Sequence, residues 1–226
     1  MDLIADGNTD PFALEKASQG LVCGMDEVGR APLAGPVTAA CVYIPEDLYD
    51  DPVWADVTDS KRLSRMKREA LYETLSDMVV FSVASASVDE IVQHNIHHAS
   101  LLAMKRAFSE MCERYALKVN LALVDGKHAP QLNCPHQTVV KGDSRSKSIA
   151  AASILAKVKR DRLMARLHDD FPDYGWESNV GYPTAQHRQA IQECGPCIHH
   201  RRSFSGVREY LEPGSKDLQR TLFKAS

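Results

Sequence analysis

The stretch of residues 21–37 limits the possible folds of this chain more than any other, and it reads LVCGMDEVGRAPLAGPV. An apolar run leads into two adjacent acids, Asp26 and Glu27, and a turn rich in Gly and Pro then leads into a second apolar run. This pattern predicts two paired strands, the first of which delivers carboxylates to its end. Carboxylates at a strand end beside a Gly-Arg turn suit a metal ion and a phosphate.

Hydrophobic periodicity along the rest of the chain predicts further strands and helices. We expect strands over residues 21–27, 36–44, 79–88, 119–124 and 137–140. We expect helices over residues 64–77, 88–115, 148–167 and 184–194, with Ser64 as the N-cap of the first, and a loop over residues 45–61. Helices that cross over between the later strands indicate an α/β fold, in which a mixed sheet of about five strands is flanked by helices.

The length of 226 residues fits one domain, or one domain with an appendage. Residues 1–20 are polar and mixed, and we expect a loose tail with one helical turn. Residues 21–170 form the predicted α/β domain. In residues 171–226, Pro, Gly and aromatic residues interrupt the regular pattern, and we expect a C-terminal helical part.

The charge of the chain is compatible with a nucleic-acid partner but does not by itself indicate one. The sequence has 27 Lys and Arg against 30 Asp and Glu, a net charge of −3, so the overall basic excess typical of nucleic-acid-binding proteins is absent. The charge is uneven, however, because residues 1–59 are acidic and residues 141–166 are basic.

The six cysteines lie mostly within apolar stretches. This placement suits buried, reduced thiols in a cytosolic protein better than a disulfide framework. We identify no basic-then-apolar leader and no apolar run of membrane-spanning length. From these features we expect a cytoplasmic protein without a membrane partner, and a monomer is the default expectation.

Three of the predicted strands end in acids: Asp26 with Glu27, then Asp125, then Asp143. In open α/β sheets, ligands collect near strand ends. Four carboxylates that meet there need cations, and oxygen ligands in this number suit Mg²⁺ or Mn²⁺ and not zinc. Two such ions can activate a water and stabilise the leaving oxygen in phosphoryl transfer. Taken singly, Asp125 before Gly and Asp143 before Ser are more often turn residues, but the four acids together favour a metal site.

Seven segments of the chain, taken in order, resemble the motifs of bacterial ribonuclease HII, the type 2 ribonuclease H family. They read GMDEVGRAPLAGPV (24–37), TDSKRLS (58–64), NIHHASLLAM (95–104), LVDG (123–126), KGDSRSKSIAAASILAKVKRDR (141–162), GYPTAQH (181–187) and HRRSF (200–204). Each motif alone is weak, whereas the ordered set is specific and spans roughly residues 21–207.

The resemblance implies a ribonuclease H-like fold with a C-terminal helical extension. It also implies an endonuclease that cuts the RNA strand of RNA–DNA hybrids and nicks duplex DNA on the 5′ side of an embedded ribonucleotide, leaving a 3′-hydroxyl and a 5′-phosphate. The implied roles are removal of ribonucleotides from DNA and removal of RNA primers.

The resemblance also assigns the site residues. The implied metal ligands and catalytic residues are Asp26, Glu27, Asp125 and Asp143. The implied substrate contacts are Gly29, Arg30 and Ala31 at the ribose 2′-OH, Tyr182 under the adjacent sugar, and Ser60 and Lys61 near the phosphate. These residue types fit the task, because the 2′-OH alone distinguishes RNA from DNA and reading it favours a Gly-rich backbone at close range.

Three positions raise structural questions. Ala31 stands where the family has Gly: at positive φ an alanine costs about 1 kcal/mol or more, whereas at negative φ only a methyl group is added near the ribose, and we expect the contact to survive. Val180 stands where the family often has a basic residue, so that phosphate contact cannot be made by charge. Glu27 neighbours Asp26 on a strand, where successive side chains point to opposite faces, so it needs a local twist to reach the same metals.

Other chemically suggestive residues have plainer interpretations. Cys194 and Cys197 copy the thioredoxin Cys-Gly-Pro-Cys motif, but they follow a predicted helix instead of opening one, so we interpret the motif as coincidence. A zinc site that adds His199 and His200 would crowd its ligands into seven residues. We expect His187 to pack or cap near Tyr182.

The basic residues of the later segments leave two interpretations open: a solvated face or a track for DNA phosphates. They are Lys157, Lys159, Arg160, Arg162, Arg201 and Arg202. We expect Asp161 to be an ion-pair partner of Lys157 or Arg162.

Three other functions stay open at this point. A two-metal nuclease or transposase-like protein on the same fold without ribonucleotide specificity would cut an all-DNA duplex. A binding module for hybrids would have no need of four acids. A redox protein built on Cys194 and Cys197 is a distant third.

Overall fold

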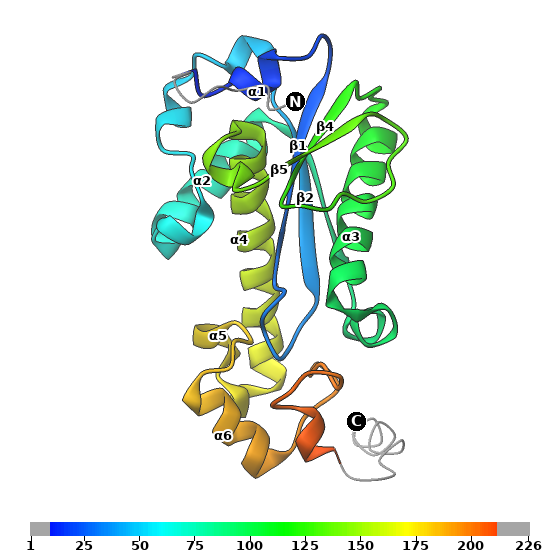
Figure 1. The fold of residues 1–226 in the computed structure, drawn as a ribbon. Coiled ribbons are helices and arrows are strands. Elements are labelled where there is room, and N and C mark those ends of the chain that lie inside the picture. Colours follow the sequence, from blue (N-terminus) through cyan, green and yellow to red (C-terminus); the bar gives the residue numbers. More distant parts are fainter. Residues whose placement is uncertain (1–9, 212–226) are drawn as a thin grey trace.

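The computed structural model describes residues 10–211, which fold around a five-stranded mixed sheet (Figure 1). The strands are β1 (Val22–Val28), β2 (Val37–Tyr43), β3 (Val80–Ala86), β4 (Leu121–Asp125) and β5 (His136–Val139). Their order across the sheet is β3-β2-β1-β4-β5. The β1–β2 and β2–β3 pairs are antiparallel, whereas the β1–β4 and β4–β5 pairs are parallel. The predicted α/β fold with a mixed sheet is therefore confirmed.

Helices cover both faces of the sheet (Figure 1). Helix α3 (Val88–Tyr115) lies on one face, and α2 (Arg65–Met78) and α4 (Lys147–Asp170) lie on the other. No helix within residues 10–211 is both long enough and apolar enough to cross a membrane.

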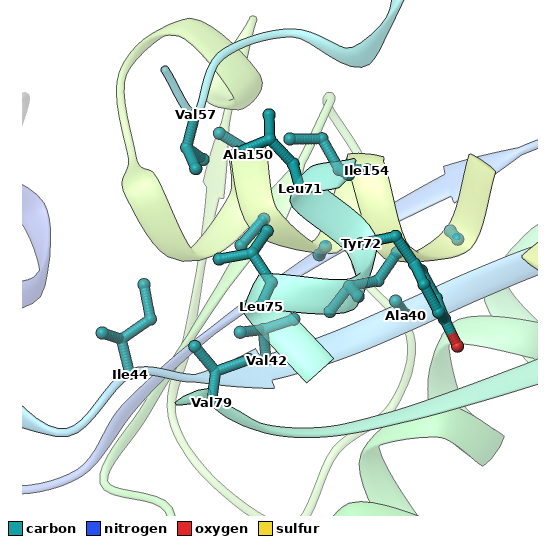
Figure 2. Packing of buried hydrophobic residues seen from close by; sticks show 14 of the residues in the cluster. Ala40, Val42, Ile44, Val57, Leu71, Tyr72, Leu75, Val79, Ala150 and Ile154 are labelled. Atoms are coloured by element: carbon teal, nitrogen blue, oxygen red, sulfur yellow. The ribbon is translucent and has the colours of Figure 1, made fainter. Parts of the chain in front are cut away.

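The alternation of side chains along each strand produces these two layers. On β1, Cys23 and Met25 face the apolar cluster under α3. On β2, Ala40 and Val42 face the cluster formed with α2 and α4, where Leu75 is among the residues that fill the space between helix and sheet (Figure 2). Burial of such side chains contributes roughly 1.5–3 kcal/mol each, so both layers are held to the sheet mainly by apolar packing.

Helix α4 approaches the sheet closely because its first turns carry small residues. Ala150, Ala151, Ala152 and Ala156 are all buried. Opposite the first turn, β1 has Gly24, where an added Cβ would come within 2.4 Å of the Ile149 backbone nitrogen. The beginning of α4 therefore packs directly on the β1 backbone, two residues before Asp26.

Side-chain caps fix where the helices begin. The Ser64 hydroxyl accepts a hydrogen bond from the Lys67 amide at 3.2 Å, which confirms Ser64 as the N-cap of α2. Ser87 and Glu90 form a reciprocal capping box at the start of α3. Thr184 caps α6 (Ala185–Cys194), the helix predicted over residues 184–194.

Two regions differ from the sequence-based expectation. The helix expected over residues 88–115 is interrupted at Asn95, whose φ of 63° and ψ of 166° are not helical. The Asn95 side chain accepts hydrogen bonds from the His97 and His98 amides and so caps a second helical segment. The expected loop over residues 45–61 contains short 3₁₀ helices at Glu46–Leu48, Pro52–Ala55 and Ser60–Arg62.

The N-terminal segment is more firmly attached than the expected loose tail. The expected helical turn is present as α1 (Ala13–Lys16), and Phe12 and Leu14 are buried in the core. The Glu15 carboxylate reaches the beginning of α4. The remainder of the expected tail, residues 1–9, lies outside the described residues.

The C-terminal part packs against the turn between β1 and β2 (Figure 1). It contains the short helix α5 (Trp176–Asn179) and α6. The Leu33 amide donates to the Gly181 carbonyl at 2.8 Å, and the Arg201 amide donates to the Leu33 carbonyl at 2.8 Å. The turn of residues 29–36 is thus held between two segments that lie some 150 residues or more later in the chain.

Candidate active site

The register of the parallel strands brings two of the acids side by side. Met25 of β1 pairs with Val124 of β4, so Asp26 and Asp125 occupy the next positions on neighbouring strands. Neighbouring strands lie about 4.8 Å apart. The Asp125 Oδ1 accepts a hydrogen bond from the Gly142 amide at 2.7 Å. This bond fixes the turn that carries Asp143 beside the end of β4.

Asp26 and Asp143 lie close enough to the neighbouring acids for those charges to raise their pKa values. Burial raises the pKa of Asp26 well above its ordinary value, and the charges of Glu27, Asp125 and Asp143 raise it further. The pKa of Asp143 is raised by burial, then by the neighbouring Asp59 and Asp125. Like charges this close repel, so the arrangement favours a cation among them.

Glu27 points to the other face of β1, as its position next to Asp26 predicts. Its Oε1 lies 3.3 Å from the Arg30 Nη1, and burial raises its pKa despite that contact. Together with Asp125, Glu27 lines a cavity of about 190 Å³ whose wall includes His97 of α3 and the loop residue His128. Asp125 therefore borders the spaces in front of both Asp26 and Glu27.

The donor chemistry of the four acids fits a hard divalent cation, because all the available ligand atoms are carboxylate oxygens. Within residues 10–211, no three His, Cys, Asp or Glu side chains stand as a closed metal-binding cluster. Glu27 is turned toward Arg30, and Asp125 is engaged by Gly142. This all-oxygen donor set, together with the raised pKa values of Asp26 and Asp143 that their acidic neighbours cause, supports a fit to cations such as Mg²⁺ or Mn²⁺.

The turn after β1 explains which of its residues must be glycine. Gly29 has a φ of +92°, and a Cβ there would meet the Arg160 Nε at 2.2 Å. Arg30 and Ala31 are exposed. Within residues 10–211, positive φ at non-glycine residues occurs at four positions, and Ala31 is not among them. Alanine therefore fits the exposed position 31 without the strain of a positive φ.

Lys61 comes close to Asp26 and Asp143 from the segment before α2, and Ser60 directly precedes it. Ser60 is buried, and its amide donates to the Ser153 Oγ of α4 at 3.3 Å. Burial alone would lower the pKa of Lys61, but Asp26, Asp59 and Asp143 raise it above its ordinary value.

Asp59 is a neighbour of the site that the sequence analysis did not single out. Its carboxylate accepts from the Lys61 amide at 2.9 Å and also contacts Asp143. Its place directly before the Ser-Lys pair of the TDSKRLS motif was the available signal.

Tyr182 lies close enough to Lys61 to contribute to the raised pKa of that lysine. The Lys157 Nζ lies 5.9 Å from the centre of its ring. Two residues earlier, Val180 has a φ of 44°, which is uncommon for a β-branched residue. After this left-handed position, Gly181 lies against the Ala34 backbone, and the following Tyr182 is half-buried.

A buried histidine pair holds the Tyr182 backbone. The His187 Nδ1 donates to the Tyr182 carbonyl at 2.9 Å, so its Nε2 is the acceptor for the Trp176 Nε1 at 3.1 Å. The His200 Nε2, 3.1 Å from the His187 Nε2, must then be a donor, and its Nδ1 accepts from the Cys197 amide. The expected packing of His187 near Tyr182 is confirmed, and burial lowers the pKa of both rings, which favours their neutral forms.

Two of the basic residues, Arg160 and Arg201, lie neither on a solvated face nor on a surface that could contact DNA phosphates. Arg160 and Arg201 are fully buried, and both form hydrogen bonds to backbone carbonyls, so they form neither a solvated face nor a phosphate track. Burial lowers the pKa of Arg160 to about 10 and that of Arg201 to about 9. By contrast, Lys157 pairs with Asp161 at 2.8 Å, as expected.

The Cys194–Cys197 segment lacks the features of a redox centre. Cys194 is exposed and Cys197 is half-buried, and both are free thiols. Burial raises the pKa of Cys197 to about 11, whereas a reactive thiolate needs a lowered pKa.

Comparison with known proteins identifies the family of this chain. Residues 23–207 match the family model described as Ribonuclease HII. The chain belongs to the ribonuclease HII family. It is 49% identical over 211 residues to the ribonuclease HII of Burkholderia mallei, which covers 92% of this chain and 94% of that protein.

Solved structures share the fold. The RNase HII in the PCNA complex from Archaeoglobus fulgidus superposes with a TM-score of 0.65 at 24% identity, over 82% of this chain and 95% of that one. Bst-RNase HIII in complex with Mn²⁺ superposes with a TM-score of 0.70 at 17% identity, over 93% of this chain and 75% of that one.

Family membership defines the general activity. Ribonucleases HII are hydrolases with ribonuclease H activity on RNA–DNA hybrids, and the ribonuclease H family depends on divalent metal ions. The chain is therefore a nuclease, which removes the binding module and the redox protein from the alternatives.

Proposed function

We propose that this ribonuclease HII family member nicks duplex DNA on the 5′ side of an embedded single ribonucleotide, in addition to cutting the RNA strand of RNA–DNA hybrids. The products carry a 3′-hydroxyl and a 5′-phosphate. One observation carries the proposal: the ends of β1 and β4 place Asp26 beside Asp125, next to a turn that exposes Arg30 and Ala31.

Asp26, Glu27, Asp125 and Asp143 are the proposed ligands of the divalent ions, Mg²⁺ or Mn²⁺. Bound there, such ions supply positive charge that activates the attacking water and stabilises the leaving oxygen. The chain contributes the fixed spacing of the acids, through the strand register and through the hydrogen bond from Gly142 to Asp125.

Substrate recognition falls to residues around the acids. The turn of Gly29, Arg30 and Ala31 is the proposed reader of the ribose 2′-OH, and Tyr182 is the proposed stacking partner of the adjacent sugar. Ser60 and Lys61 are the proposed phosphate contacts; the positive charge of Lys61 next to Asp26 and Asp143 supports this role.

The rest of the proposal concerns organisation and setting. Residues 21–170 are the proposed catalytic domain, and residues 171–226 the part that brings Tyr182 to it. We also propose that the protein is a cytoplasmic monomer that removes ribonucleotides from DNA and RNA primers from replicated strands.

A panel of three labelled substrates tests the proposal: a DNA duplex with one ribonucleotide, the same duplex in all-DNA form, and an RNA–DNA hybrid. With Mg²⁺ or Mn²⁺, we expect cleavage of the first and third but not of the second. The Asp26→Asn variant should lose both activities. Cleavage of the all-DNA duplex would favour a two-metal nuclease without ribonucleotide specificity, and cleavage of the hybrid alone would limit the activity to continuous RNA.

A further inference from the structure

All of the hydrogen bonds that the side chain of Arg201 donates go to carbonyl groups of the turn that follows β1. Its Nη1 donates to the Arg30 carbonyl at 2.8 Å and its Nη2 donates to the Gly29 carbonyl. Its Nε donates to the Gly35 carbonyl at 2.9 Å, and Nη2 also reaches the Pro36 carbonyl at 3.3 Å. The residue is 0% exposed. Within residues 10–211, no carboxylate forms a salt bridge with it.

Burying a guanidinium without a carboxylate partner carries an unfavourable desolvation free energy. Removing such a charge from water costs several kcal/mol, which carbonyl dipoles offset only when the geometry is good. The planar fork of Arg suits this task, because its donors lie in fixed directions and can orient several carbonyls at once. Arg201 therefore fixes the direction of these carbonyls.

That direction determines where two amide groups point. The described residues contain no cis peptide bond, and in a trans peptide the C=O of one residue and the N–H of the next point in opposite directions. Because Arg201 draws the Gly29 and Arg30 carbonyls inward, the N–H groups of Arg30 and Ala31 point away from it. Neither N–H donates to an acceptor within residues 10–211. Both residues are exposed, so the two amides are available to a ligand.

We propose that Arg201 is a positioning residue for ribonucleotide recognition, which aims the amide N–H groups of Arg30 and Ala31 at the 2′-oxygen of the substrate sugar. This inference rests on the proposed function and deepens it, because it names the group that sets the geometry of the reading turn. Arg201 touches neither substrate nor metal in this account and acts only through the two carbonyls.

The chemistry of discrimination follows from the donors. A ribose offers an oxygen to the two amides, whereas a deoxyribose offers none. An all-DNA duplex in the same place would cover two donors without satisfying them, and unsatisfied buried donors are what give a polar site its selectivity. Discrimination therefore depends on both amides pointing in one direction.

Arg160 provides a matched comparison from the same buried layer. It is also 0% exposed and donates to backbone carbonyls: Nε to Pro36 at 3.0 Å, Nη1 to Val180 at 2.9 Å and Nη2 to Ala34 at 3.0 Å. It does not bind the Gly29 or Arg30 carbonyl. Loss of Arg160 should therefore loosen the fold without rotating the two peptide planes.

The test measures binding of a DNA duplex with one ribonucleotide and of its all-DNA counterpart, by fluorescence anisotropy without divalent ions so that no cleavage occurs. The readout is the ratio of the two dissociation constants. For Arg201→Gln we expect the ratio to fall about tenfold, the scale of one or two lost hydrogen bonds, while the affinity for all-DNA stays within about twofold. Arg201→Lys, which keeps the charge and part of the bonding, should fall between, and Arg160→Gln should keep most of the ratio.

Two kinds of result would contradict the proposed role of Arg201. A wild-type ratio that Arg201→Gln retains, or an equal loss of the ratio in Arg160→Gln, would overturn the role of Arg201. A wild-type protein that binds both duplexes equally would overturn this inference. If that protein also leaves the single-ribonucleotide duplex uncut in a separate assay with Mg²⁺ or Mn²⁺, the proposed function fails as well.

A measurement on the wild-type protein covers the case in which Arg201→Gln does not fold. The amide NMR signals of Arg30 and Ala31 should shift with the ribonucleotide duplex and not with the all-DNA duplex. Equal shifts with both would contradict the proposal.

Discussion

The amide of Gly142 donates a hydrogen bond of 2.7 Å to the Oδ1 of Asp125, and this bond ties the end of β4 to the turn that carries Asp143. Position 142 has no room for a side chain. An added Cβ would lie 2.6 Å from the Ile149 Cδ1 and 3.1 Å from the Asp125 Oδ1. The spacing of two candidate metal ligands thus depends on a glycine that is not itself a ligand.

Gly142→Ala should therefore reduce activity more than stability. We expect kcat/KM on an RNA–DNA hybrid to fall at least about tenfold because Asp125 is displaced, while the free energy of unfolding falls by about 1–3 kcal/mol from overpacking. Adding Ile149→Val removes the Cδ1 atom, so stability should partly recover while activity stays low. Full recovery of activity in the double variant would show that the Asp125 contact is unimportant.

Glu15 should contribute strongly to stability despite its place in the N-terminal segment. Its Oε1 accepts from the Ser148 amide at 2.9 Å, the Ser148 hydroxyl at 2.7 Å and the Ser146 hydroxyl at 2.6 Å, all at the beginning of α4. Only 3% of the residue is exposed. Glu15→Ala should lower the free energy of unfolding in urea by about 2–4 kcal/mol, because it leaves buried donors unsatisfied.

Lys16→Ala is the control for this prediction, because Lys16 lies on the same turn and is exposed. Its ion pair with Asp10 is at the surface and should contribute little. Equal effects of the two substitutions would contradict the capping role of Glu15.

Tyr182 should act through its ring and not its hydroxyl group. If the ring stacks on the sugar beside the cut, Tyr182→Ala should lower kcat/KM for the single-ribonucleotide duplex by about ten- to hundredfold, the range expected for one aromatic stacking contact. Tyr182→Phe should retain most of the activity. Steady-state kinetics with the three proteins checks this, and a Phe variant as weak as the Ala variant would assign the role to the hydroxyl group.

The buried His200 should make the fold sensitive to mild acid. Burial, and then the neighbouring His187, lower the pKa of His200 to about 3, below the value of about 6.5 expected in the unfolded chain. As the pH falls, the unfolded state therefore binds a proton first, so stability is complete above pH 6.5 and is lost progressively toward pH 3.

His200→Gln removes this titration while it can keep one donor and one acceptor in place. Between pH 6.5 and pH 5, the wild type should lose about 2 kcal/mol more stability than the variant. Urea unfolding at the two pH values measures the difference. A variant with the same pH dependence as the wild type would mean that other groups cause the acid sensitivity.

The sequence predicted the parts of the site that depend on local pattern. Acids at the ends of apolar runs indicated Asp26 and Asp125, and strand alternation indicated that Glu27 faces away from Asp26. Both features follow from the period of a β-strand, which can be recognised without knowledge of tertiary contacts.

The parts that were missed depend on distant partners. Arg160 and Arg201 resemble surface residues in any local window, because the carbonyls that bind them come from the turn of residues 29–36. The polar segment around Glu15 gave no sign that its carboxylate caps a helix that begins some 130 residues later. The interruption at Asn95 was also missed, because the apolar spacing continues across it.

The most direct test of the central claim maps the product ends on a DNA duplex that contains one ribonucleotide. The account predicts a single nick on the 5′ side of the ribonucleotide, a 3′-hydroxyl that a DNA polymerase can extend, and a 5′-phosphate on the ribonucleotide, all absent in Asp125→Asn. A cut on the 3′ side with a 2′,3′-cyclic phosphate would contradict it, because the 2′-OH would then be the nucleophile and the four carboxylates would not be activating water.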